Sequence, residues 1–181
     1  MKKLFFILFP ILILLTVQCK KSTPEDQLPP ITTTGANTFG CKVNGNVWLP
    51  GHATWSISWD GPKENKLVVD ENIQNYGMNG TQIFANYFQS NATTALDLDL
   101  RGINNTGTYH LEYYRIAYFD MNTAYGPFDT FAIVNISRCD TIQKIVSGTF
   151  SFIGYTDSTR TKSVTITDGR FDVHYPLTLY Y

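Results

Sequence analysis

The chain has 181 residues, with 14 basic and 15 acidic side chains distributed along it. Because these include no block of lysine and arginine, we expect no nucleic-acid partner. The portion that follows an N-terminal leader and linker is roughly 145 residues long, the usual size of a single domain with one core.

The first 18 residues have the pattern of a secretory signal peptide. Lys2 and Lys3 precede an uncharged apolar run over residues 4–15, which is shorter than the roughly 20 residues that a membrane-spanning helix needs. Cys19 then resembles the lipid-modified cysteine of a bacterial lipobox, although Gln18 replaces the small residue that usually precedes it. The alternative is an ordinary secreted protein in which Cys19 has no anchoring role. We predict a signal peptide over residues 1–18 and lipid attachment at Cys19.

Residues 19–37 are rich in Thr, Pro and Lys and contain few side chains to bury, which predicts a flexible tether. Removing residues 1–18 takes away Lys2 and Lys3, so 12 of the 14 basic residues remain against 15 acidic ones, a net charge of −3. Lipid attachment would hold the protein at the cell envelope, and we expect the outer membrane. The sequence leaves open whether the periplasmic or the surface face displays it.

Residues 38–181 are predicted to form a single all-β domain. Thr, Tyr, Phe, Ile and Val are frequent there, turn residues recur at short intervals, and helical periodicity is almost absent. The first predicted element is a hairpin in which residues 39–43 and 46–49 flank Asn44-Gly45, a dipeptide that favours the primed turn. That turn pairs Cys41 with Trp48.

The later strands follow from alternation of apolar and polar residues. We expect strands at residues 66–69, 81–88, 96–100, 109–119 (with a break near Tyr113-Tyr114), 131–137 and 142–153. A last hairpin is predicted around Asp168-Gly169, which would pair Ile166 with Phe171 and place both on one face. About nine or ten strands suggest an antiparallel β-sandwich or a closed β-barrel.

Cys41 and Cys139 are the two cysteines that remain if Cys19 carries lipid. In an exported protein they could form a disulfide, which would contribute up to about 4 to 5 kcal/mol in the chain-entropy model. The alternative is a pair of free thiols, because sequence alone does not place the two side chains.

Two motifs resemble a family of Bacteroidetes lipoproteins of unknown function. The first is Thr-Phe-Gly-Cys-Lys-Val-Asn-Gly over residues 38–45, and the second combines residues 145–152 with residues 164–173. The resemblance covers about residues 37–175. It implies a lipidated, exported all-β domain, and it implies no activity and no catalytic residue.

Patterns typical of catalysis or cofactor binding are missing from the sequence. The three histidines have no metal-ligand spacing, and neither a Gly-x-Ser-x-Gly motif nor a phosphate-binding glycine loop occurs. We therefore expect no metal, no cofactor and no catalytic set. Asp97 and Asp99 are nevertheless a candidate pair of functional carboxylates, because they project from one strand face about 7 Å apart. They could serve glycoside hydrolysis or bind calcium, or they could form a solvated strand face together with Arg101.

Aromatic residues are the one compositional excess, with 11 Tyr, 12 Phe and 3 Trp. Trp55, Trp59, Tyr113 and Tyr114 are candidate ligand-binding side chains, because Tyr and Trp give large contact areas with few rotatable bonds. The alternative is packing within the β domain. We expect a lipid-anchored binding or structural module whose partner is an envelope protein or a glycan. The second hypothesis is a hydrolase that acts on envelope glycans or peptides.

Overall fold

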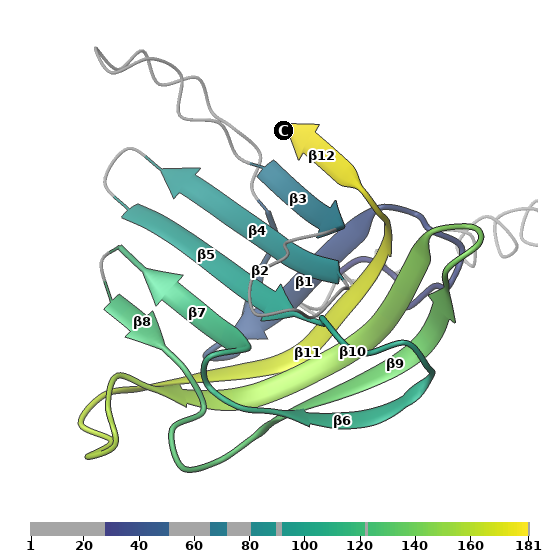
Figure 1. Ribbon diagram of the computed structural model, residues 1–181. Coiled ribbons are helices and arrows are strands. Elements are labelled where there is room, and N and C mark those ends of the chain that lie inside the picture. The colour runs from purple at the N-terminus through teal and green to yellow at the C-terminus, as the bar shows by residue number, and fades with distance from the viewer. Residues whose placement is uncertain (1–27, 51–65, 72–80, 90–91, 122, 181) are drawn as a thin grey trace, which may run out of the picture.

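The computed structural model describes residues 28–50, 66–71, 81–89, 92–121 and 123–180, and it contains twelve β-strands in these ranges. The strands form two antiparallel six-stranded sheets that stack face to face (Figure 1). Sheet A has the order β2 (Asn46–Trp48), β1 (Thr38–Val43), β11 (Ser163–His174), β10 (Ile145–Tyr155), β9 (Ala132–Asp140) and β6 (Gly107–Leu111). Sheet B has the order β12 (Leu177–Tyr180), β3 (Lys66–Glu71), β4 (Thr81–Gln89), β5 (Ala92–Asp99), β7 (Ile116–Asp120) and β8 (Thr123–Tyr125).

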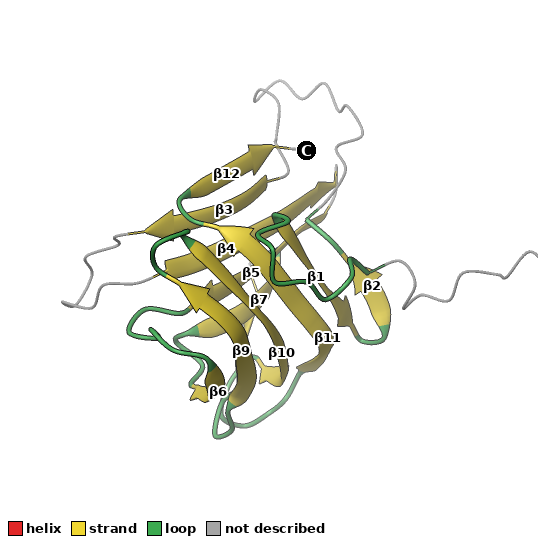
Figure 2. Cartoon of the chain, turned by 90° about the vertical axis from the view of Figure 1, so that its right-hand side faces the viewer, coloured by secondary structure: helices red, strands yellow, loops and turns green. Residues whose placement is uncertain are grey.

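The fold is an all-β sandwich, which confirms the predicted class and decides against the closed barrel. Only strands and loops appear in the described part (Figure 2), and within it no helix is long and apolar enough to cross a membrane. Strand alternation builds the core, because successive side chains point to opposite faces. On β5, Leu96 and Leu98 are fully buried between the sheets, whereas Asp97 lies on the outer face.

The structure has more strands than the nine or ten predicted. Residues 109–119, predicted as one interrupted strand, are in fact two strands in different sheets, β6 in sheet A and β7 in sheet B. The break at Tyr113-Tyr114 is therefore a crossing between the layers. β8 and β12 are two further strands that were not predicted, whereas the two strands of the last predicted hairpin are one strand, β11.

The first predicted hairpin is confirmed. Val43 pairs with Asn46 and Cys41 with Trp48, and Asn44 and Gly45 have positive φ angles of 50° and 81°. These are the backbone conformations that a primed two-residue turn requires. The turn chemistry is local, so the sequence was sufficient to predict it.

The second predicted hairpin is wrong. Residues 163–174 form one uninterrupted strand, β11, which pairs with β1 on one side and β10 on the other. Asp168 does take the left-handed conformation that Asp-Gly favours, with a φ of 52°. This residue produces a β-bulge, because the register against β10 shifts by one residue between Phe150 and Phe152.

The bulge explains why part of that prediction still holds. Ile166 and Phe171 would point to opposite faces of a regular strand, but the extra residue of the bulge changes the alternation, and both side chains are buried. Val164 and Val173 are buried on the same side. The apolar pattern was sufficient to predict which side chains of residues 163–174 face the core. Pairing with the long strand β10 decided that these residues form one continuous strand and not a hairpin.

The last ten residues of the predicted tether belong to the folded domain. Residues 28–37, named here the strap, pack on the outer face of sheet A. Leu28 is buried, and a Cβ atom on Gly40 of β1 would lie 3.3 Å from Leu28 and 3.2 Å from Pro29. The prediction of a flexible tether over residues 19–37 is therefore wrong for residues 28–37. These residues contact side chains of sheet A that lie more than 100 positions later in the sequence.

Candidate functional site

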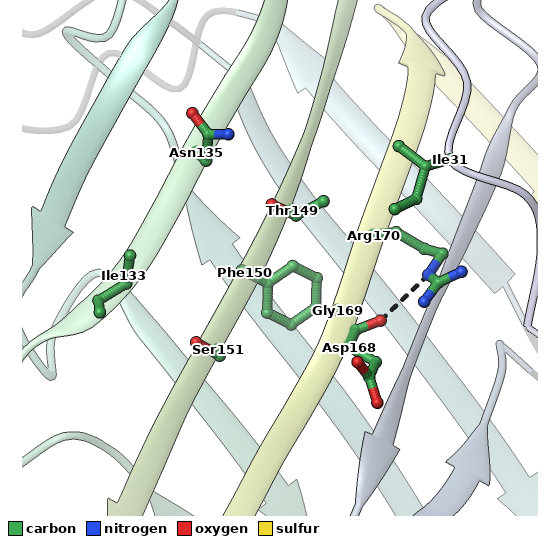
Figure 3. A pocket seen from close by; sticks show the side chains of 9 residues that line it. All are labelled: Ile31, Ile133, Asn135, Thr149, Phe150, Ser151, Asp168, Gly169 and Arg170. Atoms are coloured by element: carbon green, nitrogen blue, oxygen red, sulfur yellow. Dashed lines mark hydrogen bonds between the residues drawn. The ribbon is translucent and has the colours of Figure 1, made fainter. Parts of the chain in front are cut away.

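An open depression of about 260 Å³ lies on the outer face of sheet A. Its nine lining residues come from the strap and from β9, β10 and β11, and all are labelled in Figure 3. The depression lies on the opposite side of sheet A from the core, so its polar side chains face solvent. It is the concave feature that we take as the candidate site.

The floor of the depression is made of outward-facing polar side chains on neighbouring strands. Asn135 on β9 is the register partner of Thr149 on β10, and Thr149 is the register partner of Arg170 on β11. Ser151 lies two residues further along β10, opposite Ile133. Cross-strand partners have Cβ atoms about 4.5–5.5 Å apart, so an amide and two hydroxyls are close enough to contact one small ligand.

Two isoleucines from distant parts of the chain stand on either side of this floor. Ile133 extends from β9 and Ile31 from the strap, and Figure 3 shows them on opposite sides of Thr149 and Ser151. Their exposed fractions are 49% and 60%, high values for isoleucine. A ligand that covered them would remove apolar surface from water, worth roughly 25 cal/mol per Å².

Charged groups form one rim of the depression, and the bulge on β11 positions them. The Lys42 Nζ atom lies 2.8 Å from the Asp168 carboxylate. The Arg170 Nε donates to the Asp168 carbonyl oxygen at 3.1 Å, drawn as the dashed line in Figure 3. A second guanidinium nitrogen, Nη1, donates to the carbonyl oxygen of Pro29 at 3.2 Å. Arg170 therefore connects the rim to the strap.

Tyr113 and Tyr114, two of the four predicted aromatic residues, do not line this depression. Tyr113 stacks on Phe128 with ring centroids 4.4 Å apart, and Tyr114 meets Tyr113 edge to face. Tyr114 is 66% exposed and Tyr113 is half exposed, so packing covers only part of each ring. Trp55 and Trp59 lie outside the described residues, as does the predicted lipid-modified Cys19.

The two remaining cysteines are free thiols. Cys41 on β1 and Cys139 on β9 are separated by β11 and β10, which is three interstrand spacings of roughly 4.8 Å. A disulfide needs Cα atoms within about 7 Å, so the bridge that the sequence left open is not formed. Burial raises the pKa of Cys41 to about 12 and also raises the pKa of Cys139.

Asp97 and Asp99 share the outer face of sheet B, as predicted, but each has its own partner. Gln82 donates to both oxygens of Asp97 at 2.7 and 2.8 Å. Arg101 bonds Asp99 through its backbone nitrogen, Nε and Nη2, and Arg115 lies 3.9 Å away. Burial is the main cause that raises the pKa of Asp97. Arg101 does share this face, as the alternative drawn from the sequence proposed, but the face is not solvated at Asp99, which is only 5% exposed.

Within the described ranges, no group of three or more His, Cys, Asp and Glu side chains is placed to hold a metal ion. Comparison of the chain with protein-family models, curated protein sequences and solved structures found no match. What the molecule does is therefore inferred from its own residues.

Proposed function

We propose that the protein is a lipid-anchored component of a bacterial cell envelope that binds a glycan in the depression on sheet A. The observation that carries the glycan assignment is the combination of a polar floor with two exposed isoleucines at its sides. The anchor rests on the leader pattern and Cys19, and the resemblance of residues 38–45 to Bacteroidetes lipoproteins supports it.

The chemistry of the lining favours an N-acetylated amino sugar. Such a sugar offers hydroxyl groups, an amide and a methyl group within one small unit. The amide of Asn135 and the hydroxyls of Thr149 and Ser151 both donate and accept hydrogen bonds. The isoleucines offer an apolar contact for the methyl group and the C–H face of the ring. Because the depression is small and open, we expect weak binding, with a Kd of roughly 0.1–1 mM.

The ligand assignment can be tested with two matched trisaccharides. The lipidated chain in detergent is titrated with tri-N-acetylchitotriose and with cellotriose, which lacks the acetamido groups, and binding is followed by saturation-transfer NMR. We expect the acetylated sugar to bind at least about fivefold more tightly, since each well-placed hydrogen bond contributes on the order of 1 kcal/mol. Equal binding, or no binding of either sugar, would contradict the proposal.

A substitution and its control locate the site. Thr149→Val removes one floor hydroxyl with little change in shape and should weaken chitotriose binding about fivefold. Thr165→Val makes the same change at an exposed position of β11 outside the depression and should leave binding unchanged. If both variants behave alike, the ligand binds elsewhere.

The anchor is tested separately. Cys19→Ala should abolish incorporation of labelled fatty acid and move the protein from the membrane fraction to the soluble fraction. A wild-type chain without fatty-acid label would refute lipid attachment and leave the glycan proposal untouched.

A further inference from the structure

Asp172 is a buried carboxylate that faces the strap. It lies on β11, two residues after Arg170, and is only 1% exposed. Its oxygens accept hydrogen bonds from the Thr32 hydroxyl at 2.6 Å, the Thr34 amide at 2.9 Å, the Gly35 amide at 2.8 Å, the Ala36 amide at 3.1 Å and the Ser147 hydroxyl at 2.7 Å. Four of these five donors belong to the strap, so a single side chain of sheet A binds this segment at four of its residues.

This set of donors requires the ionised form of Asp172. Three successive backbone N–H groups that converge on one carboxylate form an anion-binding nest. Burial by itself would raise the pKa of Asp172, but the hydrogen bonds from Ser147, Thr32 and the strap amides outweigh it and hold the pKa far below its usual range. At any pH above the usual range for aspartate, the carboxylate is therefore charged and bound to the strap.

The strap is fitted closely to the sheet around this carboxylate. Gly35 has a φ of 77°, and a Cβ atom there would lie 2.2 Å from the His174 ring. Asn37 accepts a hydrogen bond from the backbone nitrogen of His174 through Oδ1 at 2.9 Å. Arg138 on β9 donates to the Thr33 carbonyl oxygen at 2.6 Å. The docked path of the strap is thus specified at several points.

The docked strap is also one wall of the depression. Ile31, which stands at its side, directly precedes Thr32, and the Pro29 carbonyl oxygen accepts the hydrogen bond from Arg170. If the strap left the sheet, the depression would lose Ile31, and Arg170 would lose a contact that orients its guanidinium group. The wall exists only while the strap is bound.

We propose that Asp172 is a positioning residue that latches the strap to sheet A, so that strap docking and ligand binding in the depression are coupled. The coupling rests on the proposed function, whereas the latch itself does not. Strap docking raises the affinity of the depression for a ligand that contacts the wall. Because linkage is reciprocal, binding of that ligand shifts the equilibrium between released and docked strap towards the docked form by the same factor.

The latch also sets how far the domain can stand from a lipid attached to Cys19. With the strap docked, the chain from Cys19 to Leu28 spans at most about 30 Å. With the strap released, the chain from Cys19 to Thr38 spans at most about 65 Å. Strap release would therefore double the reach of the domain and remove the wall of its binding site at the same time.

The test compares Asp172→Asn with the wild type by hydrogen exchange of the full chain in detergent. Asparagine keeps the shape but removes the charge and one acceptor that faces the strap amides. We expect exchange at Thr34, Gly35 and Ala36 to accelerate by roughly 100-fold or more, with little change in the core strands β10 and β5. Unchanged exchange in the strap would overturn the latch.

Two further variants keep the test decisive if Asp172→Asn disturbs folding. Thr32→Val removes a single donor and should accelerate strap exchange by a smaller factor, about tenfold. In Asp172→Ala, sodium formate should slow strap exchange again, because its carboxylate can occupy the emptied nest, whereas sodium chloride at the same ionic strength should not. Equal effects of the two salts would overturn the anion-nest account.

Chitotriose binding then tests the coupling. Asp172→Asn should lower the affinity by at least about fivefold, and formate should restore affinity in Asp172→Ala together with strap protection. A released strap with unchanged chitotriose affinity would overturn the coupling and leave the proposed function standing. A wild type that does not bind chitotriose would instead overturn the proposed function, and the exchange data would still decide the latch.

Discussion

Substitution of Gly169 by alanine distinguishes the bulged strand from the hairpin that the sequence suggests. In the structure, a Cβ atom on Gly169 would lie 2.5 Å from the carbonyl oxygen of Phe150 and 2.6 Å from its ring. Since the nearest atom belongs to the backbone of β10, a long strand held on both sides, the clash cannot be relieved by rotating a side chain. Overpacking of this kind costs typically 1–3 kcal/mol, and we place Gly169→Ala at about 3 kcal/mol.

Gly45→Ala is the matched control, because Gly45 lies in a real turn. No atom lies within 4 Å of a Cβ there, so the only cost is the left-handed backbone at φ 81°, about 1–2 kcal/mol. Both free energies of unfolding come from urea denaturation with a common m value. At this chain length, 3 kcal/mol corresponds to a fall in Tm of roughly 6–12 °C. If Gly169→Ala costs no more than Gly45→Ala, the close approach of β10 to Gly169 is wrong.

Three other predictions concern the core, the thiols and acid stability. The indole Nε1 of Trp48 donates to the Thr94 hydroxyl at 2.8 Å and so joins the two sheets. Trp48→Phe should therefore lower the free energy of unfolding, measured in urea, by about 1–2 kcal/mol. A change below about 0.3 kcal/mol would count against that hydrogen bond. Thiol labelling of the native protein, mapped by mass spectrometry, should modify Cys139 well before Cys41. The reason is that Cys41 is fully buried and its pKa is raised to about 12. Simultaneous labelling of the two thiols would contradict this burial. The pKa of Asp172 is lower in the folded state than in the unfolded state, where it is near 4. The ionised side chain therefore contributes its full stabilisation above about pH 4, and this stabilisation is lost progressively as the pH falls from there towards the folded-state pKa. Wild type and Asp172→Asn should therefore converge in stability below about pH 4, and a constant difference down to pH 2 would refute the assignment.

The depression could not be predicted from the sequence, although each of its residues obeys a simple rule. Asn135, Thr149 and Ser151 are polar residues at outward positions of strands, which alternation predicts. The strands β9, β10 and β11 do pair in chain order, but the depression also needs Ile31 of the strap and the bulge at Asp168-Gly169, and no local pattern predicts that either of these lies beside β9 and β10. The aromatic candidates Tyr113 and Tyr114 were chosen for composition, and the structure places them in a loop away from the depression.

Local patterns in the sequence determined the all-β class, the inward faces of the strands and the Asn44-Gly45 turn, because each depends on residues within a few positions of one another. The leader and the lipid at Cys19 stay predictions of the same local kind. Only the tertiary structure decided the course of β11 and of the strap. Asp168-Gly169 has the chemistry of a turn, yet pairing with β10 and β1 uses its left-handed residue for a bulge. The strap looks like a tether because its partner, Asp172, lies 140 positions from Thr32. The donors and acceptor of that contact meet only when the sheet has formed, so no window of sequence contains both.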